Sequence, residues 1–364
     1  MTDSFSPDLL YSEVEEDLRA SVRDLLTKRC PPSSLIATYD GGGAPAVWPE
    51  LARDLGLAGL TVPEERGGAG ASAAVAGVVQ EEMGRAAAPT PFLTSSVVAT
   101  TVLLAASADD LLTRVAAGES TAALVVPFST SPYGELPTVA LADGRPTGIV
   151  RSVVGVEGAD ILLVPGEDGG VYAVAAADAV VGVVPSLDMT RPVADVTLSG
   201  GAGERILEDG GAAVRSALVA GAALLASEQA GVARWCLEAT VGYLLQRRQF
   251  GRVVGGFQAI KHRLADLYAA VESGSAAARY AAVALAELGP DDPETEIATA
   301  VAASYCGDLA VFAAEEAVQL HGGIGMTWEH PAHLYLKRAK ADQIGLGTPG
   351  AYRAVLAGLV DLPA

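Results

Sequence analysis

Long segments rich in alanine, leucine and valine fill the carboxy-terminal part of the chain. They cover residues 211–247, 257–288 and 293–320, and a shorter segment covers residues 349–360. Long helices that are joined by short loops pack side by side as antiparallel bundles. We therefore predict a carboxy-terminal four-helix bundle over residues 207–364.

The first part of the chain, residues 1–122, also has a helical pattern. Ser12 and Glu15 stand three residues apart, the spacing of a capping box that satisfies the first free amides of a helix. Apolar residues then recur at three- and four-residue intervals, which places them on one face of a helix. These features predict an amino-terminal α-helical domain.

The middle part, residues 123–206, has a different period. Short valine-rich runs are separated by Gly, Pro or Asp, as strands are separated by turns. The runs are residues 124–126, 148–154, 160–164, 171–175, 180–184 and 193–198. We predict a small antiparallel β barrel or sandwich, so the fold class of the whole chain is α+β with three domains.

The charge balance restricts the possible partners. The chain has 44 acidic and 24 basic residues, and its formal net charge of −20 would repel nucleic acids and anionic membrane surfaces. Its longest apolar run has about ten residues, about half of what a membrane span needs. The three cysteines, Cys30, Cys236 and Cys306, lie far apart and do not indicate a disulfide framework. The amino terminus is acidic, unlike that of a secretory signal peptide. We expect a cytoplasmic protein with no nucleic-acid partner and no membrane span.

Common catalytic signatures are absent from the sequence. It contains neither a GxSxG nucleophile elbow nor a GxxxxGK[ST] phosphate loop. His330 and His333 stand near Glu329 and could form part of a metal site. The simpler interpretation is a polar helix start around Pro331, so we predict no metal.

Two clusters in the last part of the chain indicate ligand binding. In the first, Arg247 and Arg248 close one helix, and Gln258 opens the next. A guanidinium beside a helix amino terminus suits a phosphate, although an ordinary helix end with a plain turn has the same pattern. In the second, three glycines follow His321 within four residues. They would let a ligand approach the backbone, or they form an ordinary glycine helix end.

Taken together, these clusters resemble the carboxy-terminal signatures of the acyl-CoA dehydrogenase family. Residues 55–70 and 80–85 resemble its first domain, and residues 187–191 resemble the end of its middle domain. The resemblance covers the whole chain in the family's order. It implies FAD as cofactor, an acyl-CoA substrate, and electron-transferring flavoprotein as the usual acceptor. In that reaction the α-hydrogen leaves as a proton and the β-hydrogen passes to flavin N5 as a hydride, which gives a 2-enoyl-CoA.

The resemblance also implies which residues bind FAD. Arg247 matches the arginine that holds the FAD pyrophosphate, and Gln249 and Phe250 flank it. The segment that holds the adenosine half is matched near the end of the third long helix. The full implied cofactor-binding set is Arg247, Gln249, Phe250, Gln258, Gln319, Gly322, Gly323 and Thr348. In the family, these groups of one subunit extend across a dimer interface and contact the FAD that is bound in the neighbouring subunit.

The sequence departs from the family at the catalytic base. Most members carry a Glu directly before a Gly-Thr pair, and Leu346 occupies that position. Some relatives place the base on the first long helix of the last domain, where Gly221 stands. The Thr-Glu-Pro, Gly-rich loop that lies along the flavin ring is also missing from residues 126–134. Loss of a positioned base lowers the rate by about 10²–10⁴, so we predict no catalytic residue in this chain.

Three functions remain open. The first is a subunit of a heteromeric acyl-CoA dehydrogenase that contacts FAD while a second chain supplies the base. The second is a self-sufficient homo-oligomeric flavoenzyme. Its base would be an unrecognised carboxylate, for which Glu228 and Asp342 are the nearest candidates in the sequence, or its chemistry would need no base. The main-chain amide of Leu346 could still polarise the thioester carbonyl in such an enzyme. The third is a non-catalytic scaffold that has lost FAD. The sequence does not identify the acyl group.

Overall fold

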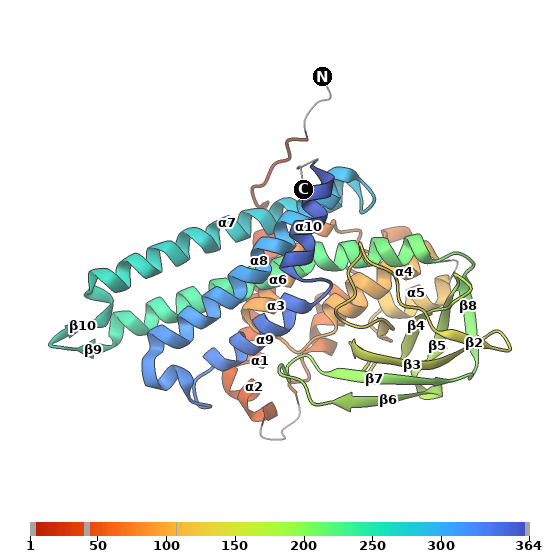
Figure 1. Cartoon of the computed structure of the whole chain (residues 1–364), viewed down its shortest axis with the longest axis horizontal. Coiled ribbons are helices and arrows are strands. Elements are labelled where there is room, and N and C mark those ends of the chain that lie inside the picture. Colours follow the sequence, from red (N-terminus) through yellow and green to blue (C-terminus); the bar gives the residue numbers. More distant parts are fainter. Residues whose placement is uncertain (1–4, 40–43, 107, 361–364) are drawn as a thin grey trace.

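The computed structural model describes residues 5–39, 44–106 and 108–360. Its three parts have the predicted types: helices at the amino terminus, β-sheets in the middle and a helical bundle at the carboxy terminus (Figure 1). The bundle extends along one side of the molecule, and the sheets lie at one end of it (Figure 1). The predicted fold class is therefore confirmed.

Among its described residues, the amino-terminal part contains five α-helices. They are α1 (Glu13–Arg29), α2 (Pro32–Tyr39), α3 (Ala73–Arg85), α4 (Thr100–Ala105) and α5 (Asp109–Ala116), with π-helical segments at Glu50–Asp54 and Phe92–Ala99. The predicted capping box is present, because Ser12 and Glu15 each accept the other's backbone amide. α2, which begins at Pro32, was not predicted from the sequence. Proline suits the first helical position because that amide has no helical partner.

The middle part consists of two four-stranded sheets. The strands are β1 (Ala122–Leu124), β2 (Ala140–Ala142), β3 (Arg145–Val154), β4 (Ile161–Pro165), β5 (Val171–Ala175), β6 (Ala179–Val184), β7 (Val193–Ser199) and β8 (Gly203–Leu207). The sheet orders are β1-β4-β5-β8 and β2-β3-β7-β6, so the sheets form a sandwich and not a closed barrel. The expectation of purely antiparallel pairing was wrong for β1, which runs parallel to β4. Two strands and their connections separate β1 from β4, which leaves enough chain for a parallel crossover.

The carboxy-terminal part is dominated by three long helices. They are α6 (Gly211–Gln246), α7 (Gln258–Leu288) and α8 (Pro293–His321), followed by α9 (Ala332–Ile344) and α10 (Pro349–Leu359). α6 is buried along most of its length, and α3 crosses it closely at two glycines. A Cβ at Gly84 or at Gly231 would collide with backbone atoms of the facing helix. This close approach joins the amino-terminal helices to the bundle.

A short hairpin joins α6 to α7 and projects from the end of the bundle (Figure 1). It consists of β9 (Arg248–Gln249) and β10 (Arg252–Val253). Phe250 and Gly251 form its turn with φ values of +51° and +76°. The hairpin holds the first of the two sequence clusters away from the core.

In the part of the chain that the structure describes, two bundle helices have the length and composition of membrane spans. They cover Gly211–Gln246 and Pro293–Met326, and 94% and 61% of their most apolar windows are buried inside the fold. Core helices of a packed bundle satisfy the same criteria, so this is weak evidence for a membrane.

Candidate functional site

The two family base positions meet at one point in the structure. Leu346 follows α9, and Gly221 lies in α6. A Cβ on Gly221 would lie 3.0 Å from Leu346 Cδ1 and 2.8 Å from Val98 Cγ2. The resemblance therefore identified two neighbouring positions, and neither carries a group that can take a proton.

The main-chain amide of Leu346 is already engaged. It donates to the carbonyl oxygen of Phe128 at 2.7 Å. The Phe128 ring covers Gly345, where a Cβ would lie 2.5 Å from Phe128 Cζ. The expectation that this amide could polarise a thioester carbonyl was therefore wrong, because the middle part of the chain occupies the donor.

The cavity at this point is too small for an acyl chain. It has a volume of about 30 Å³ and an almost wholly apolar lining that includes Val98, Val126, Phe128, Leu218 and Leu346. Pockets that hold small molecules measure roughly 300–1,000 Å³. The side chains of all three parts of the molecule fill the place where an acyl group would need room.

Most of the predicted FAD contacts gather at the opposite end of the bundle. Tyr243, one turn before Arg247, stacks on His321, which precedes Gly322, with the ring centroids 4.6 Å apart. This stacking brings the ends of α6 and α8 together. The predicted contacts that are exposed at this end are Arg247, Gln249, Phe250, Gln258, Gln319, Gly322 and Gly323. Thr348 lies apart from them and caps α10 by accepting the amide of Ala351 at 3.3 Å.

This end of the bundle has open space and free donors. The side chain of Phe250 is 90% exposed. α7 begins at Gln258, and no side chain caps its first amides. Gly322 has a φ of +65°, and no heavy atom lies within 4 Å of a Cβ built on Gly322 or on Gly323. An anionic ligand can therefore approach both backbone and guanidinium groups here.

The histidines near this end form the predicted helix start. α9 begins at Ala332, and His330 Nδ1 accepts the Ala332 amide at 3.3 Å. Within the described ranges, no three His, Cys, Asp or Glu side chains are placed to hold a metal ion.

Comparison with known proteins identifies the family. Residues 12–119 match the family model described as acyl-CoA dehydrogenase, N-terminal domain, and residues 208–358 match acyl-CoA dehydrogenase, C-terminal domain. The chain belongs to the acyl-CoA dehydrogenase family. Members of this family are FAD-dependent oxidoreductases.

Relatives resemble this acyl-CoA dehydrogenase chain over nearly its whole length. "Acyl-CoA dehydrogenase IpdE2" of Mycolicibacterium smegmatis is 37% identical, and the match covers 93% of this chain and 96% of the relative. A chain of the ChsE4-ChsE5 complex from Mycobacterium tuberculosis is 27% identical, with a TM-score of 0.86 over 98% of this chain and 100% of the other. A chain from a variant of the Tcur3481-Tcur3483 steroid ACAD is 28% identical, with a TM-score of 0.83 over 96% of this chain and 98% of the other.

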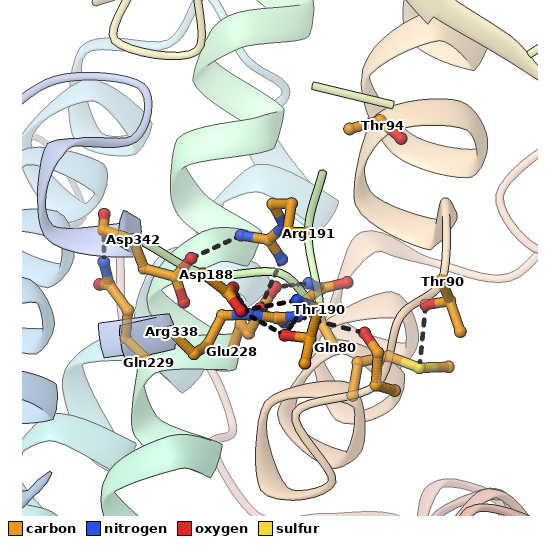
Figure 2. Close-up of polar contacts among 12 residues, drawn as sticks. Gln80, Thr90, Thr94, Asp188, Thr190, Arg191, Glu228, Gln229, Arg338 and Asp342 are labelled. Carbon is orange, nitrogen blue, oxygen red and sulfur yellow. Dashed lines mark hydrogen bonds and ion pairs between the residues drawn. The ribbon is translucent and has the colours of Figure 1, made fainter. Parts of the chain in front are cut away.

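A buried ionic cluster joins the middle and carboxy-terminal parts of this acyl-CoA dehydrogenase (Figure 2). Arg338 donates to Asp188 at 2.5 Å and to Glu228 and Thr190 at 2.6 Å each. Arg191 donates to Glu228 and to Asp342, both at 2.5 Å. We define the ionic cluster as Asp188, Thr190, Arg191, Glu228, Arg338 and Asp342. The ionic cluster was not predicted from the sequence, where its visible signal is a charged residue, Glu228, within the apolar stretch of α6.

The ionic cluster gives Glu228 and Asp342 a structural role. Both side chains are fully buried and bonded to arginines, and neither lines the cavity at Leu346. A general base must lie within hydrogen-bond reach of the proton that it removes. The structure therefore does not support either carboxylate as the base of a self-sufficient enzyme.

The ionic cluster holds three carboxylates against two arginines. Burial alone would raise the pKa of Asp188 and of Glu228, but the arginines beside them outweigh burial and lower it. Burial raises the pKa of Asp342 to about 8, and the nearby Glu228 carboxylate adds to the rise. The raised pKa makes Asp342 the carboxylate of the cluster that most favours a proton near neutral pH.

Replacing Asp342 by asparagine should remove a pH-dependent loss of stability. The folded-state pKa is raised above the ordinary value of 3.8, so the folded protein binds a proton that the unfolded chain has lost between about pH 4 and pH 8. Rising pH therefore destabilises the natural protein across this window, whereas asparagine stays neutral. Urea unfolding at about pH 5 and pH 8 should show D342N gaining stability over the natural protein as pH rises.

Asp308 provides the control for this experiment. It is a half-exposed carboxylate in α8 that pairs with Arg353 at the surface. D308N should change the free energy of unfolding by nearly the same small amount at both pH values. If the difference in unfolding free energy between D342N and the natural protein does not change with pH, Asp342 is ionised in the folded state.

Proposed function

We propose that this chain is the FAD-contacting subunit of a heteromeric acyl-CoA dehydrogenase. The partner is a second acyl-CoA dehydrogenase chain, which supplies the catalytic base and the acyl pocket. The observation that carries the proposal is the closed site at Leu346. There both base positions are apolar, and the amide that could polarise the thioester is bonded to Phe128.

The two halves of a family FAD site fit this chain differently. The end of the bundle suits the diphosphate and adenosine, because Arg247 and the free amides of α7 are exposed and Gly322 and Gly323 leave open space. The cavity of about 30 Å³ at Leu346 suits neither a flavin ring nor an acyl chain. FAD bound at the shared site would accept the hydride from the β-carbon of the acyl-CoA. This chain would contribute binding and orientation, and the partner would remove the α-proton.

The residues at the bundle end have separate roles in this proposal. Arg247 can form charge-assisted hydrogen bonds to the pyrophosphate, and the first amides of α7 add the positive end of a helix dipole. Gln249, Phe250 and Gln258 flank that position, and Gln319 lies one turn before the two glycines. The position of Thr348, away from this group, favours helix capping over contact with the same ligand.

The names of two relatives support a two-chain assembly. Both the ChsE4-ChsE5 complex and the Tcur3481-Tcur3483 steroid ACAD are named as pairs of chains. Steroid acyl-CoA thioesters are accordingly the first substrates to test with the assembled complex. Electron-transferring flavoprotein as acceptor rests on the family resemblance. The cytoplasm remains our proposed compartment, which the three free, buried cysteines support.

The number of FAD molecules per chain tests the proposal. The chain should be colourless when it is purified alone, and it should yield one FAD per pair when co-purified with an acyl-CoA dehydrogenase chain that carries the family Glu. About one FAD per chain without a partner, together with acyl-CoA turnover, would instead establish a homomeric enzyme. A protein that is colourless in both preparations would be the scaffold.

A further inference from the structure

A column of three aromatic rings lies beneath the proposed FAD contacts. Tyr243 of α6 stacks on His321 of α8, and the His330 ring follows with its centroid 4.2 Å from that of His321. We call these three residues the ring column. Arg247 lies one helical turn beyond Tyr243, and Gly322 directly follows His321. The ring column therefore connects both groups of FAD contacts to the bundle.

The hydrogen bonds of the ring column require a neutral His330. Its Nδ1 accepts the amide of Ala332 at the start of α9, and a ring nitrogen accepts only when it carries no proton. His321 Nδ1 lies 2.7 Å from the carbonyl oxygen of Ala317, to which it can donate. The amino terminus of α9 also disfavours a positive charge on His330, because helix amides point toward it.

The neighbouring groups whose charge lowers the pKa of a histidine here are all cationic when protonated. Protonated His321 and His333 would lower the pKa of His330, and Lys337 of α9 lowers the pKa of His333. Lys337 Nζ lies 4.0 Å from the ring centroids of Tyr39, in α2, and of Trp328. Burial lowers the pKa of His330 to about 4, with further lowering by His321 and His333, and burial also lowers the pKa of His321. When one of these two rings is protonated, a proton on the other would meet like charge within the same stack.

We propose that the ring column positions the segment Gly322–Met326 for FAD and holds it only while His330 is neutral. This inference rests on the proposed function, because it concerns the same FAD contacts. His330 acts through the segment and not on the ligand, so it is a positioning residue. The segment itself is a short 3₁₀ turn, and four of its five residues, Gly322, Gly323, Ile324 and Met326, are exposed. It therefore has few contacts of its own to hold it in place.

The direction of the pH effect follows from the two states of the segment. A released histidine regains an ordinary pKa near 6.5, so the released form binds more protons as pH falls below that value. The positioned form loses stability from about pH 6.5 down to about pH 4. FAD retention by the complex should fall over the same range.

Hydrogen exchange of residues 322–331 tests the positioning directly. H330N keeps an acceptor near the position of Nδ1 and cannot gain a charge. In the natural protein, exchange corrected for intrinsic rates should rise about threefold or more between about pH 7.5 and pH 5.5, and in H330N it should stay nearly constant. H262N, which removes the exposed histidine of α7, should behave like the natural protein. Equal pH dependence in H330N and the natural protein would overturn the proposal.

FAD release from the assembled complex provides the second readout. The release rate at about pH 5.5 should exceed that at pH 7.5 by about threefold or more in the natural complex but not in the H330N complex. If H330N does not fold, unchanged exchange of the natural segment across this range overturns the proposal by itself. A complex that never holds FAD refutes the proposed function, whereas FAD retention with a pH-independent segment refutes only the role of His330.

Discussion

Replacing Arg338 by alanine should lower the free energy of unfolding by about 3–5 kcal/mol. Its side chain is 1% exposed and is the central donor of the ionic cluster. Alanine would leave the Asp188 carboxylate without its cation and Glu228 with Arg191 alone, in a site that water does not reach. The large effect comes from this uncompensated buried charge, and it is measurable as a shift in urea unfolding at neutral pH.

Lys340 of the same helix supplies the matched control. It pairs with Glu315 at 3.0 Å, and the two side chains are 40% and 55% exposed. K340A should change the unfolding free energy by less than about 1 kcal/mol, because water and salt screen such pairs. If R338A lowers the free energy of unfolding no more than K340A does, the ionic cluster does not stabilise the fold. The triple variant R338M/D188N/E228Q should recover part of the loss, since it removes the unpaired charges together with their partner.

Replacing Arg247 by alanine should weaken FAD binding by the assembled complex by about tenfold or more, because a hydrogen bond to a charged group contributes roughly 1.5–3 kcal/mol. Arg247 is exposed at the end of α6, beside the uncapped start of α7. The loss should appear as fewer FAD molecules per complex after dialysis, with the helical content of the protein unchanged.

Arg151 tests whether this loss is specific. It is an exposed arginine of β3, and R151A changes the net charge by the same amount as R247A. R151A should retain FAD at the level of the natural complex. If the R247A complex retains as much FAD as the natural complex, Arg247 does not bind FAD. The proposal that this chain contacts FAD would then lose its main support.

The long elements were predictable because each is specified by its own local pattern. The long apolar segments became α6, α7 and α8, and the reciprocal side chains of Ser12 and Glu15 start α1 as expected. The short strands β2 and β8 were missed, because three residues of alanine and leucine, or a run with Gly, Glu and Arg, carry no clear strand period. The parallel pairing of β1 depends on the path of its connections, which no local pattern records.

The candidate site was predictable only in part, because several of its contacts join residues that lie far apart in the sequence. The resemblance located Leu346 and Gly221, and the structure brings them into contact. The engaged amide of Leu346 was not predictable, because its acceptor is a backbone carbonyl more than 200 residues earlier in the chain. The ionic cluster was hidden likewise, since its members are ordinary charged residues until the fold buries them together.

The ionic cluster also bears on the order in which the chain folds. The bonds from Arg338 to Asp188 and from Arg191 to Asp342 join residues 150 and 151 positions apart. Closing such long loops costs entropy before any contact compensates it, so we expect these bonds to form after the bundle and the sheets have docked. Interactions that form after the transition state slow unfolding more than they speed folding. We therefore expect the cluster to lengthen the lifetime of the folded chain more than it speeds its folding.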